Sequence, residues 1–454
     1  MNRTLATLVY RTAALLRGEK TFAYLRDYER NPFRDLGAVQ VWQEAEIAAL
    51  LEYACEHVPF YREFRETPFA QFPLIDKKML KAGGNSFLSE QRETLGRLTT
   101  KVTSGSTSEP LKIVKDAGSM AREQAATYRS YGWAGVRPGD AQARFWGVPL
   151  KAKDARKNAV RDALLNRKRY SAFNYTPASF PGYMDALRAQ GPDYIYGYPS
   201  ILAEIGHWLR QDPARAGSPG KGPVPTLRAI ITTAEILTPT MREAIEQGFA
   251  TRVFDEYGCA EVGSIAHDCE HGSLHVNSEN LLVEILTDEG EIRSEGTGRL
   301  VLTELHNRAQ PLIRYDSGDY GELSFAPCAC GRALPVLENV HGRAYDTVIG
   351  PEGRRYNAAF FSYIFKEVQL RGEMVRQFQV IQNDREITFR IVRGADYDSS
   401  SEALLARLLA DEFGDYFEPR FEYPDSIERE SSGKLRQLKR VSPPDPVSQV
   451  LDSP

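Results

Sequence analysis

The feature that most constrains the fold of this chain is an alternation of short apolar runs with helical patterns through its middle. Between the apolar runs, residues recur at helical spacing behind Ser200, a candidate N-cap, and a second helical pattern opens at Thr238 and Pro239. Strands that alternate with helices predict a parallel or mixed α/β sheet. The apolar runs that read as buried strands are 142–149, 194–198, 228–233 and 252–256.

The predicted secondary structure of the chain changes in character twice after this region. From 281 to 323 it becomes β-rich, with a hairpin signal at Asp288-Glu289-Gly290, and it changes again near Gly342. Beyond that point we predict a helix, a hairpin, a second helix and a strand, at 358–368, 377–392, 402–413 and near Phe421. We therefore predict a large N-terminal α/β domain with a β-rich subdomain, followed by a small mobile α+β lid and a disordered tail. The expected bounds are 1–342, with the subdomain at about 270–342, then 343–440 and 441–454.

Composition narrows the function classes. The 454 residues carry a net charge of only −4, and Lys and Arg are scattered, so no nucleic-acid partner is expected. The apolar segment 5–16 is too short to span a bilayer and lacks a cleavage site, which favours a helix packed on the main domain over a membrane-surface contact. Without an export signal we expect a cytoplasmic protein with reduced cysteines. Together these properties favour an enzyme that acts on a small molecule.

The sharpest local signal is a hydroxyl-rich loop around one glycine. Hydroxyl groups can wrap phosphate oxygens, and glycine lets the backbone approach them closely. No Gly-Lys-Ser/Thr follows, so this is not a Walker A loop, and by itself the segment is equally compatible with a polar surface loop. Its residues are Thr103, Ser104, Gly105, Ser106, Thr107, Ser108, Glu109 and Pro110.

Four later segments carry groups that suit nucleotide chemistry. Glu261 follows Tyr257-Gly258 after a strand, where a carboxylate could hold Mg²⁺ against phosphate. Asp319 could accept hydrogen bonds from ribose hydroxyls. Gly342-Arg343 marks the second change in predicted secondary structure. Lys434 lies in a Gly-containing loop, and a mobile ammonium can stabilise charge that develops on a carboxylate and an α-phosphate.

In this order and spacing, the five segments resemble the adenylate-forming superfamily, in the branch of the phenylacetate–CoA ligases and their capsular-polysaccharide-associated relatives. The resemblance covers about Glu44 to Arg440. It implies ATP-dependent activation of a carboxylic acid, with Lys434 and Arg343 as catalytic residues, the latter near ribose and phosphate. It also implies that Glu261 binds Mg²⁺ and that the hinge of the lid falls beside Arg343. The implied nucleotide-binding residues are Thr103, Ser104, Gly105, Ser106, Thr107, Ala234, Glu235, Tyr257, Gly258 and Asp319.

The sequence departs from this branch after the hinge, where 348–354 does not match the expected loop. That loop shapes the second half-reaction, so the acyl acceptor stays open between CoA, an amine and a sugar hydroxyl. CoA and an aryl or arylacetic acid are the branch's common substrates and remain the leading expectation. A non-catalytic nucleotide-binding member is a further alternative, although Lys434 argues against it. A homodimer is expected by resemblance alone.

Cysteine and histidine residues form a second cluster. Cys269, Cys328 and Cys330, with His271, could close a tetrahedral structural Zn²⁺ site, and His267 and His275 are rival fourth ligands. Relatives in this branch carry similar cysteines. The competing interpretation is three thiols without metal.

Overall fold

A single mixed sheet of twelve strands organises the large part of the molecule. The computed structural model describes residues 3–16, 18–30, 33–102, 111–146, 159–172, 175, 177–215, 217, 222–343, 348–351, 355–356, 361, 364–365, 368, 374–428 and 435–441. The strand order is β11-β10-β12-β13-β14-β9-β8-β7-β6-β5-β3-β4. From β4 to β7 neighbouring strands are parallel, and from β7 to β11 they are antiparallel. The mixed α/β sheet predicted from the alternating pattern is confirmed.

The parallel half holds the four predicted strands and one that the pattern missed. The predicted strands are β3 (Gln142–Trp146), β5 (Tyr194–Gly197), β6 (Ala229–Thr233) and β7 (Val253–Cys259), and the missed one is the edge strand β4 (Arg167–Ser171). Their apolar residues pack against α7 (Phe180–Gln190), α8 (Pro199–Arg210) and α9 (Pro239–Phe249) in one buried cluster. Gly206 and Gly248 let α8 and α9 approach, because a Cβ on Gly206 would lie 2.3 Å from the carbonyl oxygen of Ala244.

The two predicted helix starts had different outcomes. Thr238 caps α9 by accepting a hydrogen bond from the Met241 N–H at 3.2 Å, with Pro239 in the first turn, as expected. Ser200 does not cap α8; the N-cap position belongs to Tyr198, and Pro199 begins the helix. The proline sets the start two residues earlier, because its fixed φ suits the first helical position.

The antiparallel half forms the predicted β-rich region. It curls around a core that also receives α3 (Leu36–His57) and the segment around Ile75. Its hairpin at Gly290 joins β10 to β11, with Gly290 in a left-handed conformation (φ 86°). Its strands are β8 (Gly263–Asp268), β9 (Leu274–Val276), β10 (Leu281–Leu286), β11 (Ile292–Arg293), β12 (Gly296–Glu304), β13 (Tyr315–Ser324) and β14 (Val336–Arg343).

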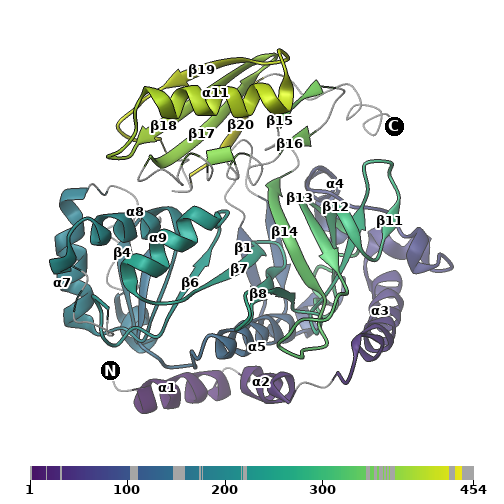
Figure 1. Cartoon of the computed structure of the whole chain (residues 1–454). Helices are drawn as coiled ribbons and strands as arrows, with labels where there is room; N and C mark the ends of the chain where they lie inside the picture. The colour runs from purple at the N-terminus through teal and green to yellow at the C-terminus, as the bar shows by residue number, and fades with distance from the viewer. Residues whose placement is uncertain are drawn as a thin grey trace.

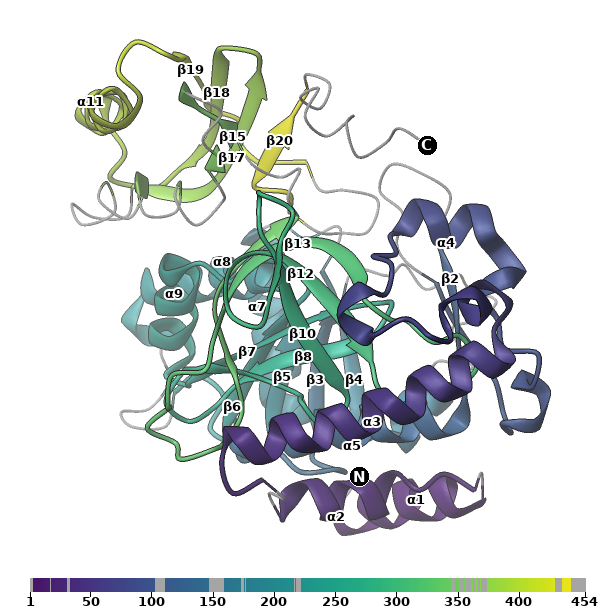
Figure 2. The same cartoon turned by 90° about the vertical axis from the view of Figure 1, so that its right-hand side faces the viewer.

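Helices and a small hairpin complete this part. α5 (Ala117–Trp133) packs on β8, while α1 (Arg3–Leu16) and α2 (Thr21–Glu29) lie along the edge of the molecule beneath it (Figures 1 and 2). The hairpin of β1 (Thr99–Val102) and β2 (Lys112–Lys115) is followed directly by α5, and α4 (Lys77–Gly83) precedes it. Within the described residues no helix is both long and apolar enough to cross a membrane.

The C-terminal residues form a separate layer with its own core, above the large sheet in Figure 1. A four-stranded sheet in the order β19-β18-β17-β20 carries α11 (Ser399–Phe413). The predicted hairpin is present as β17 (Val375–Asn383) and β18 (Glu386–Arg393), with Asp384 at φ 55° in the turn. β19 (Glu418–Glu422), β20 (Leu438–Arg440) and the pair β15 (Val348–Ile349) and β16 (Arg355–Tyr356) complete it. Most of the helix expected at 358–368 lies outside the described residues.

Candidate active site and metal centre

The first part of the candidate nucleotide site follows the end of β6. Ala234 has φ 69°, a left-handed conformation that is uncommon for a residue with a side chain and often marks a functional position. The next residue, Glu235, accepts a hydrogen bond through Oε2 from the backbone N–H of Ser200, at 3.1 Å in the first turn of α8. Its Oε1 accepts one from the backbone N–H of Leu435 at 2.7 Å. One carboxylate therefore joins the large sheet, the start of α8 and the C-terminal layer.

The second part joins β7 to β13. The Tyr257 hydroxyl donates to Asp319 Oδ2 at 2.7 Å, so two residues expected to bind the nucleotide are in direct contact. Burial raises the pKa of Tyr257 well above its ordinary value and the Asp319 carboxylate adds to the shift, which keeps the hydroxyl a donor. Asp319 is also the register partner of Arg343 across β13 and β14. The ladder thus brings the expected ribose ligand beside the backbone of the expected hinge arginine.

Glu261 lies in the turn between β7 and β8. Its Oε1 accepts a hydrogen bond from the Tyr315 hydroxyl at 3.2 Å, and Tyr315 begins the strand that holds Asp319. Gly258 makes the turn possible, because a Cβ at this position would lie 2.4 Å from the carbonyl oxygen of Gly263. Through Tyr315, the Glu261 carboxylate is linked to β13, the strand that also carries Asp319.

Two expected elements fall outside the described residues. The hydroxyl-rich loop from Thr103 to Pro110, with Ser104, Gly105, Ser106 and Thr107, joins β1 to β2 in sequence, and Lys434 directly precedes Leu435. The side chain of Arg343 is likewise not described. The structure places Ala234, Glu235, Tyr257, Gly258 and Glu261 near the carboxyl ends of β6 and β7, and the Tyr257 hydroxyl reaches Asp319 on β13.

An aromatic surface lies on the same half of the sheet. Trp146 stacks on Tyr196 with ring centroids 5.7 Å apart and lies 4.8 Å from Tyr198. The Arg144 guanidinium lies over the Trp146 ring at 4.4 Å. Phe145 points to the other face and stacks on Tyr170, because neighbouring side chains of a strand alternate.

A carboxylate borders this surface. Glu256 Oε2 accepts a hydrogen bond from the Tyr131 hydroxyl at 2.7 Å. Burial raises the pKa of Glu256 to about 7, although the Tyr131 hydrogen bond and Arg144 oppose the shift. Neither Arg144 nor Glu256 belongs to a sequence motif, so no local signal marks them as site residues.

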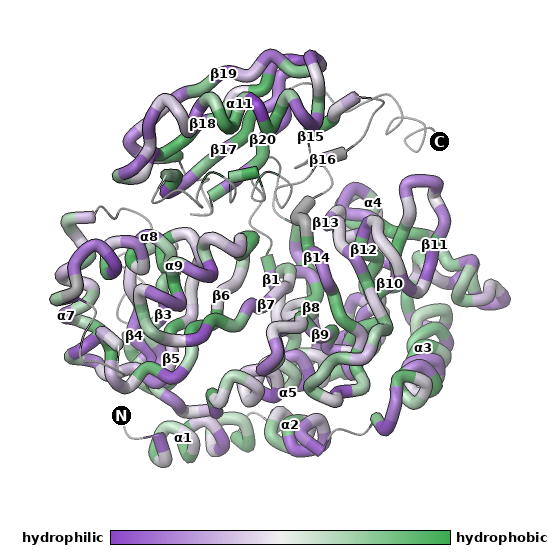
Figure 3. Tube along the Cα trace, in the orientation of Figure 1, coloured by the Kyte–Doolittle hydropathy of each residue, from purple (hydrophilic) through white to green (hydrophobic). Residues whose placement is uncertain are grey.

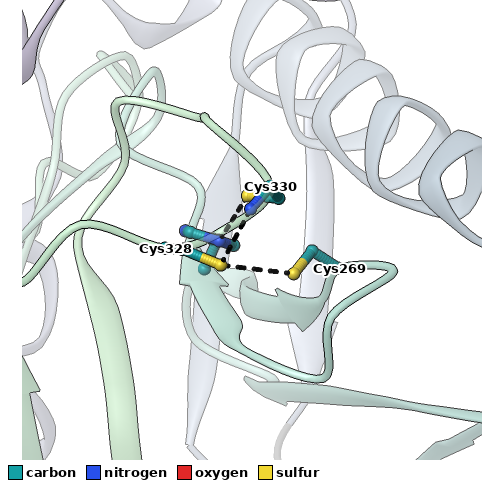
Figure 4. Close-up of side chains that lie close together, drawn as sticks. Cys269, Cys328 and Cys330 are labelled. Carbon is teal, nitrogen blue, oxygen red and sulfur yellow. Dashed lines mark hydrogen bonds between the residues drawn. The ribbon is translucent and has the colours of Figure 1, made fainter.

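The structure also brings three of the five cysteines together (Figure 4). Cys269 Sγ and Cys328 Sγ are 3.8 Å apart, and Cys330 Sγ is 3.2 Å from His275 Nε2. The ligand atoms of Cys269, His275, Cys328 and Cys330 all lie within 4.8 Å of one another and could hold a metal ion.

The fourth position of this cluster is occupied by His275 and not by His271. His275 lies in β9, paired with β8 and β14, and this pairing turns its ring toward Cys330. His271 meets the cluster only through its backbone N–H, which donates to Cys269 Sγ at 3.3 Å. His267, the other rival, lies within hydrogen-bonding distance of the Asp268 carbonyl through Nδ1 and is outside the group.

A family model and two sequence relatives point to the same group of proteins. Residues 348–441 match the model of the CapK C-terminal domain. The phenylacetate–coenzyme A ligase of Thermus thermophilus is 25% identical over 350 residues, which are 72% of this chain and 74% of that protein. Protein CapK of Staphylococcus aureus is 24% identical over 384 residues, 81% of this chain and 79% of that protein.

A solved structure shares the fold. The 2-hydroxyisobutyryl-CoA ligase in the postadenylation state, in complex with 2-HIB-AMP, superposes with a TM-score of 0.68 at 18% identity and covers 92% of this chain and 91% of its own. The sequence relatives, the C-terminal family model and the arrangement of the motifs agree with one another. They support the branch of the phenylacetate–CoA ligases and the CapK proteins, among the adenylate-forming enzymes, as the family that this chain resembles.

Proposed function

We propose that this enzyme condenses a carboxylic acid with ATP to give an acyl-adenylate and pyrophosphate, and then transfers the acyl group to the thiol of CoA. The observation that carries the proposal is the Glu235 carboxylate, which accepts hydrogen bonds from both Ser200 and Leu435. It ties the C-terminal layer to the edge of the sheet where Tyr257, Glu261 and Asp319 meet. Leu435 is the next residue in the sequence after Lys434, which supports a catalytic role for that lysine.

Each group of the candidate site has a chemical role in this proposal, as do Lys434 and the hydroxyl-rich loop, which lie outside the described residues. Asp319 accepts hydrogen bonds from the ribose hydroxyls, while Tyr257 fixes the carboxylate and lines the adenine side. Glu261 would hold Mg²⁺, which neutralises charge on the phosphate oxygens. The Lys434 ammonium stabilises the charge that develops as the carboxylate oxygen attacks the α-phosphorus and pyrophosphate leaves. Thr103, Ser104, Gly105, Ser106 and Thr107 bind the departing phosphates.

The aromatic surface supports an aryl or arylacetic acid as the substrate. Trp146 is partly exposed near the carboxyl end of β3, where α/β sheets bind ligands, and the buried rings of Tyr196 and Tyr198 pack against it. Flat apolar rings favour stacking with a flat apolar substrate.

The acceptor is tested by single-turnover release of AMP. We expect CoA to accelerate AMP release from the preformed acyl-adenylate by at least about tenfold. The thiol is a stronger nucleophile than water, and its attack displaces AMP and forms the acyl thioester. The assay first finds an activating acid by acid-dependent exchange of labelled pyrophosphate into ATP. It then compares AMP release with CoA, with an amine or a sugar, and with buffer alone.

AMP release that responds to an amine or a sugar and not to CoA would contradict the proposed acceptor. Absence of exchange with every acid, despite ATP binding, would favour a non-catalytic member.

We also propose that the four-residue cluster holds a structural Zn²⁺ ion. A tetrahedral site with Zn–S bonds of about 2.3 Å separates its sulfur atoms by about 3.8 Å, which is the distance between Cys269 Sγ and Cys328 Sγ. The Nδ1 atom of His275 lies 3.1 Å from the Leu334 carbonyl oxygen, an arrangement that leaves Nε2 free to ligate. Backbone N–H groups of His271, Cys330 and Arg332 donate to the three sulfurs, as expected around thiolates. Such a closed site would fasten β8 and β9 to the loop before β14.

The zinc proposal predicts close to one Zn²⁺ per chain by elemental analysis. We expect His275→Ala and Cys330→Ser to lose the metal and to lower the melting temperature, because binding free energy of a closed site adds to folding. The matched controls are His271→Ala, which removes only an imidazole outside the group, and Cys259→Ser, a cysteine outside the cluster; both should keep the metal. Metal-free wild-type protein, or metal lost from His271→Ala and kept by His275→Ala, would overturn the assignment.

A further inference from the structure

The first helix turns its largest apolar side chains away from the protein. Leu5, Leu8, Leu15 and Leu16 of α1 are 52%, 60%, 77% and 84% exposed. Their spacing places them on one face of a helix. The buried residues of α1 are Ala6 and Ala14, so the helix packs through small side chains.

Polar contacts fix the orientation of this helix. Thr7 Oγ1 lies 2.8 Å from the Pro138 carbonyl oxygen, and the Tyr10 hydroxyl donates to the Leu165 carbonyl at 3.3 Å. These contacts arise from the face opposite to the leucines. The exposed leucine row is therefore a consequence of how α1 is anchored to the large domain.

The segment that anchors Tyr10 adds apolar and basic groups to the same region. Val160 and Leu164, one helical turn apart, are 62% and 49% exposed. Between 159 and 171 the chain has one acidic residue, the buried Asp162, and four basic residues. α1 itself contains two arginines and no acidic residue. The basic residues are Arg3 and Arg11 in α1, and Arg161, Arg167, Lys168 and Arg169. Arg167 and Arg169 pair with Asp162, and Arg3 lies 3.9 Å from Asp140, so the exposed Arg11, Arg161 and Lys168 carry the charge that a partner would meet.

We infer that α1 and the adjoining segment 159–169 bind the surface of a bilayer that contains anionic lipid. Leucines on one face of a helix, flanked by cationic side chains, are the arrangement by which amphipathic helices enter the boundary between headgroups and acyl chains. The excess of positive charge here contrasts with a net charge of −4 for the whole chain, which makes an anionic partner specific to this face. A second copy of the chain fits less well, because a two-fold contact would bring the same basic residues together.

The position of this face is compatible with catalysis at the membrane. α1 and α2 lie at the end of the molecule opposite the C-terminal layer in both views (Figures 1 and 2). Along α1, apolar and polar residues are mixed, and Figure 3 shows green and purple bands along this helix. A bilayer bound to this end would leave the C-terminal layer and the motif residues accessible from the aqueous side.

The test is cosedimentation of the full chain with lipid vesicles. We expect binding to phosphatidylcholine vesicles that contain about one third phosphatidylglycerol, little binding to pure phosphatidylcholine, and weaker binding in high salt. The triple variant Leu8→Ser, Leu15→Ser, Leu16→Ser should lower partitioning at least about tenfold. The pair Arg161→Glu and Lys168→Glu should weaken binding to anionic vesicles only.

The matched control replaces exposed apolar residues elsewhere. Val41 and Val441 are 68% and 59% exposed, and Val41→Ser with Val441→Ser should bind vesicles as the wild type does. Pyrophosphate exchange and the melting temperature should be unchanged in the triple variant, which separates this inference from the proposed reaction. Failure of the wild type to bind anionic vesicles would overturn it. So would a wild-type dimer that the triple variant converts to a monomer, which would assign the face to a second copy.

Discussion

Replacing Lys434 by alanine is expected to lower acid-dependent pyrophosphate exchange at least about 10²-fold while ATP binding survives. A charge already in position at the reacting phosphate stabilises the transition state by several kcal/mol, and about 2.7 kcal/mol corresponds to this factor. Binding should persist because the substitution leaves intact the nucleotide contacts that we propose around Tyr257 and Asp319. The measurement is exchange of labelled pyrophosphate, with ATP affinity followed by calorimetry.

Lys439 provides the matched control for this experiment. It is an exposed lysine on β20, five residues further along the same C-terminal layer. Lys439→Ala removes the same charge from the same layer and should leave exchange within about twofold of the wild type. Equal losses in the two variants would indicate a general electrostatic or folding effect and contradict a catalytic role for Lys434.

The elements that sequence predicts well are those with a local signature. The strands β3, β5, β6 and β7 are short apolar runs between helical patterns, and Thr238 followed by Pro239 is a local start signal. Edge strand β4 was missed because its sequence, Arg-Lys-Arg-Tyr-Ser, is mostly charged. Arg167 and Arg169 pair with Asp162, Lys168 is exposed, and a strand with one neighbour needs no continuous apolar run.

Contacts between distant segments could not be predicted in the same way. Glu235 and Leu435 are 200 residues apart, and only the packing of the C-terminal layer onto the sheet brings them within 2.7 Å. The cysteine–histidine cluster shows the same limit. Cys269 and His271 are two residues apart in sequence, but the pairing of β9 with β8 and β14 turns His275 toward the sulfurs. Which histidine joins the cysteines depends on strand register, which sequence spacing does not encode.

A buried ion pair between two distant segments is a further feature that could not be predicted from the sequence. Lys115 ends β2, at the base of the hairpin whose connection is the hydroxyl-rich loop, and its side chain is 0% exposed. Its Nζ donates to Glu304 Oε1 at the end of β12, at 2.6 Å. Burial raises the pKa of Glu304, and Lys115 opposes that shift. The pair therefore fastens the β1–β2 hairpin to the antiparallel half of the sheet.

Lys115→Met is expected to lower the free energy of unfolding by about 3–5 kcal/mol, because it leaves the buried Glu304 carboxylate without its cation. Adding Glu304→Leu should restore most of the loss, since two apolar side chains of similar volume have no charge to desolvate. Arg293→Met is the matched control: its pair with Glu291 has the same 2.6 Å distance but side chains 59% and 61% exposed, so the loss should stay below about 1 kcal/mol. Denaturant unfolding of the wild type and the three variants gives the free energy of unfolding of each protein.

A double variant as unstable as Lys115→Met would show that lysine packing, and not the unpaired carboxylate, causes the loss. Equal losses for Lys115→Met and Arg293→Met would contradict the dependence on burial from which the prediction follows.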